Sequence, residues 1–282
     1  MKICKILILI VALFITGKSG AQNVLDGVYV KEHTQTRQVI PYPYLREADV
    51  MWSKRIWRYI DLNEKINLPF RFPASKSIKD RKSLIDVLMD AIEEGSLTAY
   101  NFADDEFTSP ITIKEIEARG GSRTDTMKMN RPEPPYDEYD TVIAKEFSRD
   151  KVIAFRVKED WFFDKQRSVM DVRIIGIAPL VLAVDEAGNA REDNSKIPLF
   201  WIYYPEARKL LATSEVFNRF NGAERRTFDD IFQKRFFNSY ITKEENVYDR
   251  RIEDYKQGVN ALLESEKIKD EITNLEHDMW EY

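Results

Sequence analysis

Cysteine and histidine are almost absent from this sequence, which has one cysteine and two histidines among 282 residues. The cysteine, Cys4, lies in an apolar N-terminal segment, and His33 and His277 are far apart along the chain. Zinc sites and histidine-centred triads need several such side chains at matched spacings. The composition therefore argues against thiol catalysis, disulfide cross-links, cysteine-ligated zinc and a histidine-based active site.

Glycine is also scarce. The 10 glycines form neither a phosphate-binding loop nor the Gly-x-Ser-x-Gly elbow of many hydrolases. Carboxylates are plentiful at 104–106, 185–193 and 229–230, so a two-carboxylate hydrolase is an alternative. Such clusters are usually solvated faces or helix caps, and 185–193 lacks the alternating oxygen ligands of a calcium loop. We predict no catalytic residue, no metal and no cofactor.

Long apolar runs are missing after the N-terminus, where residues 6–15 follow Lys2 and Lys5 and precede small residues at 19–21. This order is typical of a secretory signal peptide. The run is roughly half the length of about 20 residues that a membrane-spanning helix requires, which disfavours an N-terminal anchor. We expect cleavage after Ala21, export from the cytoplasm and membrane contact only through partners.

Neither sign of charge dominates the chain, which has 43 basic and 48 acidic residues. Removal of Lys2, Lys5 and Lys18 with the leader changes the formal net charge from −5 to −8. A mildly acidic protein is a poor binder of nucleic acid. Because 32% of residues are charged and 12% aromatic, we expect a solvated surface around a substantial core.

The first part of the exported chain lacks helical periodicity. Residues 22–45 are rich in Thr, Gln, Tyr and Pro and predict an extended arm with a short strand at 28–30. Such an arm either docks on a neighbouring molecule or packs on its own domain.

Two helices are predicted next. The first, over 46–60, has apolar residues at three- and four-residue steps, namely Ala48, Trp52, Ile56 and Tyr59. The second, over 83–94, begins at a cap formed by Ser83 and Asp86 and ends at Gly95. The stretch 119–140 is rich in glycine and proline, so we interpret it as a linker that does not enter a sheet.

Strand patterns follow the linker. Residues 152–163 and 168–177 predict a β-hairpin with a polar turn at 164–167. Pro179 interrupts the apolar pattern before a further run at 180–184, and a turn at 185–193 leads to another at 197–204. We expect about four strands of antiparallel sheet.

The last third of the sequence predicts helices. One begins at Pro205, and a second covers 227–240 with Thr227 as its cap. The range 244–282 shows two further amphipathic repeats suited to packing on another helix, within the chain or in a partner. Similar caps at 83–88 and 227–232 suggest either two related halves or two ordinary helices.

Together these patterns predict the α+β class, with a small antiparallel sheet flanked by amphipathic helices in one or two subdomains. The expected ranges are a signal peptide (1–21), an arm (22–45), a helical subdomain (46–118), a linker (119–140), a sheet with helices (141–243) and C-terminal helices (244–282).

Aromatic and arginine residues offer candidate partner-binding positions. Consecutive large rings at 161–163 cannot all point the same way along a strand, so one is exposed unless both faces are covered. Arginine beside tryptophan is typical of interface hot spots, although it also occurs on solvated helix faces. The candidate partner-binding residues are Trp52, Arg55, Trp57, Trp161, Phe163, Arg225 and Arg226.

Four long stretches of the sequence resemble the GldN family, called PorN in some members. They are residues 23–29, 46–55, 159–167 and 226–232, and two of them contain tryptophan. The family belongs to the gliding-motility and type IX secretion machinery of Bacteroidetes. The resemblance implies a non-enzymatic periplasmic protein associated with the outer membrane.

The resemblance also implies partners. These are a GldK-type outer-membrane lipoprotein, with which the protein would form a ring, and the periplasmic part of a GldM-type protein, itself tied to an inner-membrane GldL-type motor protein. From the residues alone, two alternatives stay open, namely a carboxylate-dependent cell-wall or glycan hydrolase and a glycan-binding module.

Overall fold

The structure is a computed structural model that describes residues 36–74, 81–103, 105–130, 138–145, 147–183, 191, 195–219 and 221–279. For 123–130 and 138–145 it describes the backbone alone. The predicted signal peptide, the strand at 28–30 and nearly all of the turn at 185–193 lie outside these ranges. No helix in the described ranges is long and apolar enough to cross a membrane.

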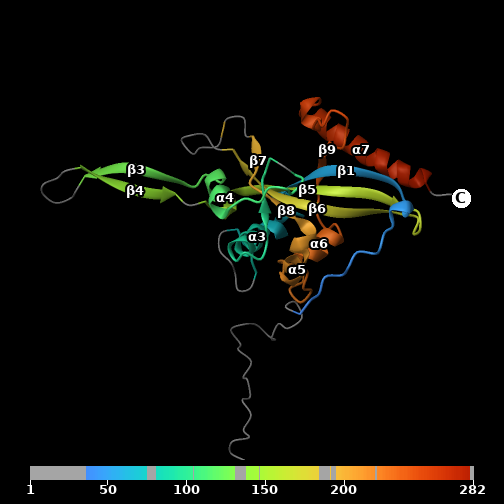
Figure 1. Cartoon of the computed structure of the whole chain (residues 1–282), viewed down its shortest axis with the longest axis horizontal. Helices are drawn as coiled ribbons and strands as arrows, with labels where there is room; N and C mark the ends of the chain where they lie inside the picture. Colours follow the sequence, from blue (N-terminus) through green and yellow to red (C-terminus); the bar gives the residue numbers. More distant parts are fainter. Residues whose placement is uncertain are drawn as a thin grey trace, which may run out of the picture.

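An antiparallel sheet of seven strands forms the centre of the molecule (Figure 1). Its strands are β1 (Val50–Asp61), β2 (Ala99–Tyr100), β5 (Val152–Asp164), β6 (Val169–Leu182), β7 (Lys196–Pro198), β8 (Trp201–Tyr203) and β9 (Tyr240–Glu244). The order is β2-β8-β6-β5-β1-β9, and β7 also pairs with β6. The α+β class is therefore confirmed, with a larger sheet than the four strands predicted.

Strand β1 replaces the helix predicted over 46–60. It pairs with β5 on one side and β9 on the other, and residues 56–60 are all buried. Successive side chains of a strand point to opposite faces, so Ile56 and Ile60 lie on one face and Trp57 and Tyr59 on the other. Because both faces are covered, the apolar pattern has no period of two, and its three- and four-residue steps resemble those of a helix.

The predicted hairpin is confirmed, since β5 and β6 pair in register through Asp164 and Val169. Asp164 accepts backbone hydrogen bonds from Gln166 and Arg167 and thereby fixes the turn. The predicted break at Pro179 is wrong, because β6 continues to Leu182. On the side of β6 that faces away from β5, the paired strand changes from β8, which pairs as far as Ile177, to β7, which pairs from Leu180. Pro179 lies at this change of partner, so its missing N–H removes no hydrogen bond from either pairing.

A second hairpin lies where the linker was predicted. Strands β3 (Arg123–Asn130) and β4 (Glu138–Lys145) pair antiparallel over their full lengths and project away from the central sheet in Figure 1. The prediction that 119–140 stays out of sheets is wrong for 123–130 and 138–140. The proline-rich residues 131–137 lie outside the described part. The proposed subdomain boundaries stay predictions.

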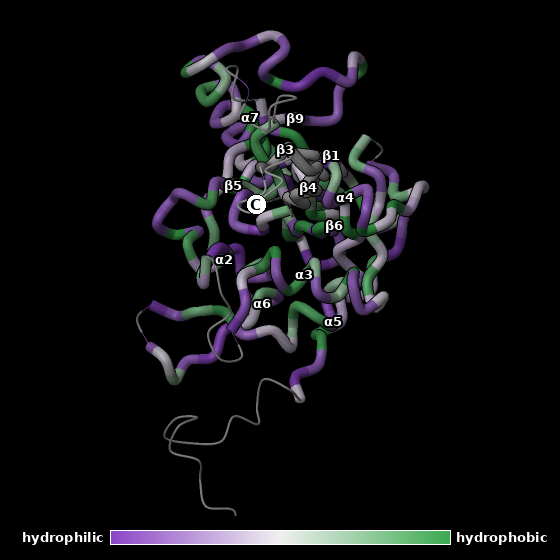
Figure 2. The backbone as a smooth tube through the Cα atoms, turned by 90° about the vertical axis from the view of Figure 1, so that its left-hand side faces the viewer, coloured by the Kyte–Doolittle hydropathy of each residue, from purple (hydrophilic) through white to green (hydrophobic). Residues whose placement is uncertain are grey.

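Helices lie below the sheet in Figures 1 and 2, and a longer one lies above it. Those below are α2 (Leu68–Arg71), α3 (Leu84–Glu93), α5 (Tyr204–Thr213) and α6 (Phe228–Gln233). The predicted caps are confirmed, because the hydroxyls of Ser83 and Thr227 accept the N–H groups of Asp86 and Asp230. Gly95 follows α3 with a φ of +72°, which glycine adopts without strain.

Short elements complete the chain. They are α4 (Ile113–Arg119), which leads into β3, and the 3₁₀ turns η2 (Glu47–Asp49), η3 (Arg149–Lys151) and η4 (Ile252–Asp254). Helix α6 ends at Gln233 instead of continuing to 240, and Arg235 takes a φ of +54°. A backbone at positive φ cannot continue a right-handed helix.

Of the two amphipathic helices predicted over 244–282, only the second is confirmed. Strand β9 and η4 precede α7 (Val259–Asp278), so Tyr248 and Tyr255 are exposed loop residues and not part of a helical stripe. Within α7, Ile268 and Ile272 are buried in a cluster that includes Ile241 of β9. Within the described chain, α7 thus packs on its own sheet, and its packing on a helix of a partner stays a prediction.

The main core joins the sheet to the lower helices. Phe70 of α2 contacts the rings of Phe155, Phe228, Phe232 and Phe237 at centroid distances of 5.2–6.4 Å. Figure 2 shows hydrophobic stretches of the backbone around β6, α3 and α6. Burial of such rings stabilises the fold by roughly 1.5–3 kcal/mol each. The core contains residues from both sides of the predicted linker.

Candidate interaction surface

Five of the seven predicted partner-binding residues lie on β1 and β5. Trp57 and Phe163 are buried, and the Trp57 indole N–H donates to Asp105 at 2.7 Å. The exposed ring expected in 161–163 is absent, because Phe162 and Phe163 are buried and Trp161 is half-buried. Both faces of β5 are covered here, so Trp57 and Phe163 are unavailable to a partner in this structure.

Trp52, Trp161 and Arg55 are partly accessible but have partners within the chain. Both indoles pack against the cluster under α7. The Arg55 guanidinium donates to both carboxylate oxygens of Asp160, its cross-strand neighbour, at 2.7 and 3.1 Å. The side chains of this strand pair therefore mainly make contacts within the fold and leave little surface for a partner.

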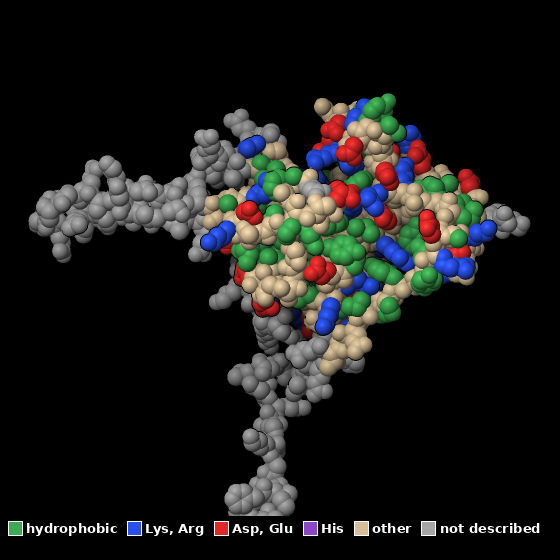
Figure 3. All heavy atoms as spheres, viewed as in Figure 1, with side chains coloured by type: hydrophobic (Ala, Val, Ile, Leu, Met, Phe, Trp, Pro, Cys, Tyr) green, Lys and Arg blue, Asp and Glu red, His purple; other side chains and the backbone are tan. Residues whose placement is uncertain are grey.

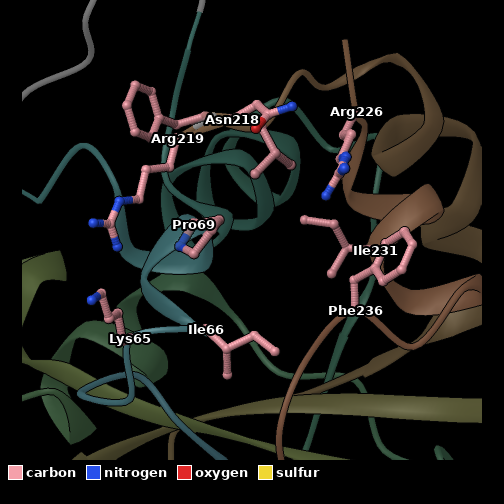
Figure 4. A pocket seen from close by; sticks show the side chains of 10 residues that line it. Lys65, Ile66, Pro69, Asn218, Arg219, Arg226, Ile231 and Phe236 are labelled. Atoms are coloured by element: carbon pink, nitrogen blue, oxygen red, sulfur yellow. The ribbon is translucent and has the colours of Figure 1, made fainter. Parts of the chain in front are cut away.

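Arg225 and Arg226 precede α6 and lie at a different place, beside an open groove. The Arg226 guanidinium donates to Glu224 at 2.7 Å and lies over the Phe236 ring at 5.1 Å. Figure 4 shows its side chain directed toward the groove that also receives Ile231 and Phe236. Of the predicted residues, Arg226 is therefore the one that the structure places at an open, partly apolar surface.

The described part of the arm, residues 36–45, packs on its own domain. Tyr42 lies between the guanidinium groups of Arg173 and Arg208, at 5.2 and 4.3 Å from the ring centre. The same two arginines donate to the backbone carbonyls of Pro43 and Ile40, each at 2.8 Å. For this part of the arm, the prediction of packing on its own domain is the correct one.

Sequence reasoning missed these docking residues. Nothing in the sequence around Arg208 on α5 or Arg173 on β6 marks these arginines as contacts for an arm 130 or more positions away. The one available signal was the segment Pro41-Tyr42-Pro43, since a tyrosine held between two prolines is a stiff, extended ligand for a groove.

Burial and hydrogen bonds shift the pKa values of two ionisable groups at the arm, Tyr42 and Asp230. Burial raises the pKa of Tyr42, against the hydrogen bond from Gln233. Burial also works against ionisation of Asp230, but hydrogen bonds from Thr227 and Arg37 outweigh it, so the pKa of this carboxyl is lowered. The arm is therefore held by a charged carboxylate at neutral pH.

Several other buried charges have hydrogen-bond partners within the fold. The Lys158 ammonium is 1% exposed, donates to the Asp105 carbonyl at 2.6 Å and lies 3.3 Å from a Glu106 oxygen. Arg208 and Tyr204 both donate to Asp229. Among the described residues, no group of His, Cys, Asp and Glu side chains could hold a metal ion. Basic and acidic side chains are interspersed around α7 and the adjoining surface in Figure 3, without one large patch of either sign.

Comparison with known proteins adds the family. No curated protein matches the sequence at a significant level. A family model described as gliding motility associated protein GldN matches residues 45–281, which include every helix and strand described above. The chain therefore belongs to the GldN family of gliding motility associated proteins.

Proposed function

We propose that the protein is a non-enzymatic periplasmic assembly component of the type IX secretion and gliding-motility machinery. In this role it forms a ring with a GldK-type outer-membrane lipoprotein and couples that ring to the GldM-type periplasmic shaft. Membership of a gliding-motility family over residues 45–281 is the observation that carries the proposal. The predicted leader agrees with export.

The arrangement of charge supports a non-enzymatic role. Lys158, Glu159 and Asp229 are among the most buried charged groups, and each is paired with groups that hold elements of the fold together. A catalytic side chain must be free to reach the reacting atoms of a substrate. These three instead join neighbouring segments of the fold.

Exposed apolar side chains support a protein partner. Val247 and Tyr248 in the loop before η4 are followed by Val259, Leu262 and Leu263 on the first turns of α7, and all five are exposed. Val259, Leu262 and Leu263 lie within about one turn of α7, and exposed apolar side chains grouped in this way are typical of interaction sites. Because Ile268 and Ile272 hold the second half of α7 on the sheet, the first half is presented on a fixed support.

A charge introduced on this surface tests the proposal. We expect Leu263→Glu to reduce recovery of the GldK-type lipoprotein when the tagged protein is purified from envelope fractions, and to reduce secretion and gliding. Leu263 is 62% exposed, so the change spares the core. Asn260→Glu adds the same charge to the same exposed region without removing an apolar side chain and serves as the matched control.

Size measurement and a substrate assay complete the test. The wild-type complex should migrate as a large assembly that contains both proteins. If the protein is recovered alone and its deletion leaves secretion and gliding intact, the proposal is wrong. Release of soluble products from peptidoglycan by the purified protein would instead support the hydrolase, and retention without cleavage the glycan-binding module.

A further inference from the structure

An apolar groove opens between α2, α6 and the loop before α6, on the face of the sheet opposite α7. Its volume is about 610 Å³, within the range of about 300–1,000 Å³ found for ligand-binding pockets. Ile66 and Pro69 form one wall, and Ile231 and Phe236 form the other, as Figure 4 shows. Ile66 is 54% exposed and Phe236 45% exposed, so both present apolar surface to whatever fills the groove.

The floor of the groove is part of the folded core. Val216 and Ile231, which line the groove, are buried in the main core cluster. Val216 also donates its N–H to the Arg226 carbonyl at 2.9 Å, which ties the loop after α5 to the loop before α6. A site held in this way needs little ordering when a ligand enters, so less of the contact energy is lost on binding.

The rim of the groove is basic. Its charged lining residues are Lys65, Arg219 and Arg226, and the Glu224 carboxylate lies 2.7 Å from the Arg226 guanidinium. In Figure 4 Lys65 and Arg219 lie on one side of the apolar walls and Arg226 lies on the other. The positive charge is therefore spread across the groove instead of being confined to one end.

Neighbouring acidic side chains do not cancel this charge. Asp230 forms a two-point ion pair with Arg37, with Nη2 and Oδ1 at 3.1 Å. Glu64 accepts a hydrogen bond from Asn238 at 2.7 Å. Arg225 adds a further positive charge beside Arg226, so the balance around the groove stays positive.

We propose that this groove binds a segment of a partner protein in which large apolar side chains are flanked by carboxylates. The apolar walls take the large side chains, and the cations on both sides attract the carboxylates. A fatty acid or phospholipid carries its charge at one end and could not reach the cations on both sides at once. The site goes beyond the assembly role proposed above, because it is separate from the α7 surface and is defined by the chemistry of its ligand.

Binding of a synthetic peptide to the purified protein tests this proposal. The probe is fluorescein-labelled Asp-Glu-Leu-Phe-Leu-Glu-Asp, followed by fluorescence anisotropy. We expect saturable binding that Ile66→Asp weakens by about tenfold or more, because a carboxylate in the apolar wall repels those of the peptide. Leu262→Asp is the matched control and should bind like the wild type, since Leu262 is 49% exposed but lies on α7.

A charge swap tests recognition by the rim. The same peptide with lysine in place of every acidic residue should bind the wild type about tenfold or more weakly than the acidic peptide. In the double variant Lys65→Glu with Arg226→Glu, the preference should reverse, so that the lysine peptide binds more tightly. A general loss of structure cannot produce such a reversal. An unchanged preference in the double variant would contradict the proposal.

Three other results would also overturn it. The first is absence of saturable binding of the acidic peptide, and the second is equal weakening by Ile66→Asp and Leu262→Asp. The third is binding of phosphatidylglycerol vesicles that Ile66→Asp abolishes, without binding of the peptide, which would show a lipid site instead. These measurements need no envelope partner, so their failure is distinct from failure of the proposed assembly role.

Discussion

Glu159 on β5, which is fully buried, forms a two-point ion pair with Arg235, the second residue after α6. The two N–O distances are 2.9 and 3.2 Å. The indole N–H of Trp161 also donates to this carboxylate, at 3.0 Å. Arg235 lies in turn over the rings of Trp161 and Phe237, at 5.4 and 5.3 Å. This single arginine thus connects the end of α6 to the centre of the sheet.

Loss of that arginine should destabilise the protein strongly. We expect Arg235→Ala to lower the free energy of unfolding in urea by about 3–5 kcal/mol, because it leaves a buried carboxylate without its counter-charge. Glu159→Gln combined with Arg235→Ala should be less destabilised than Arg235→Ala alone, since the amide carries no charge. A loss below about 1 kcal/mol for Arg235→Ala would contradict this account, because that is the contribution of an exposed pair.

A close approach between Gly176 and Phe107 should make substitution of Gly176 destabilising. A Cβ at position 176 would lie 2.4 Å from Cζ of Phe107 and 3.2 Å from the Ile202 carbonyl oxygen. We expect Gly176→Ala to displace the Phe107 ring and to cost roughly 1–3 kcal/mol in thermal or urea unfolding.

Gly222→Ala is the matched control, because a Cβ at position 222 meets nothing within 4 Å. We expect it to be neutral or slightly stabilising, through a smaller loss of chain entropy on folding. Equal effects of the two substitutions would show that the Phe107 contact is not the cause. The ring of Phe107 lies 6.2 Å from that of Trp201, so Gly176→Ala should also change the tryptophan emission.

The sequence predicted those elements whose signals are local. Helix α3 is defined by the Ser83 cap, its apolar stripe and Gly95, and the β5–β6 hairpin by the turn at Asp164. Strand β1 was missed because its burial depends on β5 and β9, which are about 100 and 190 positions away. A strand covered on both faces has no alternation for sequence reasoning to detect.

The candidate partner-binding residues and the residues that hold the arm show the same difference between local signals and long-range contacts. Trp57 and Phe163 are large side chains that the sequence could equally place in a core or at an interface, and the fold places both in the core. Arg226 precedes the helix capped by Thr227 and lines an open groove, and its role in partner binding stays a prediction. Arg173 and Arg208 were missed because they act on an arm that reaches them only through the tertiary fold.

Acid should weaken the attachment of the arm through Asp230. Its pKa is lowered in the folded protein, since hydrogen bonds from Thr227 and Arg37 outweigh burial. A lowered pKa means that the stabilisation is complete above the unfolded value of about 3.9 and is lost as the pH falls through the folded value. We expect Arg37→Ala to reduce the fall in unfolding free energy in this acidic range.

The comparison needs a control close to the arm. Arg46→Ala also removes an arginine, but one that pairs with Asp49 only three residues away, at 2.7 Å. We expect its stability to follow the wild-type pH dependence through the range in which Asp230 titrates. Parallel curves for Arg37→Ala and the wild type between pH 5 and pH 2 would rule out this role for the long-range pair.

Alkaline pH should destabilise the protein at the edge of the sheet formed by β9. There the rings of Tyr59 on β1 and Tyr240 on β9 lie 5.0 Å apart. Burial raises the pKa of Tyr240 to about 12 and also raises that of Tyr59, although Lys196 works against the shift at Tyr240. The unfolded chain loses these protons near pH 10, before the folded chain does. The stabilisation is therefore complete below pH 10 and is lost as the pH rises through about 12.

The absorbance of tyrosinate during a pH titration should show a group of tyrosines that ionise late, and Tyr240→Phe should remove one tyrosine from this group.

If the variant and the wild type lose the same number of protons above pH 11, Tyr240 does not belong to that group and the packing of β9 on β1 needs revision.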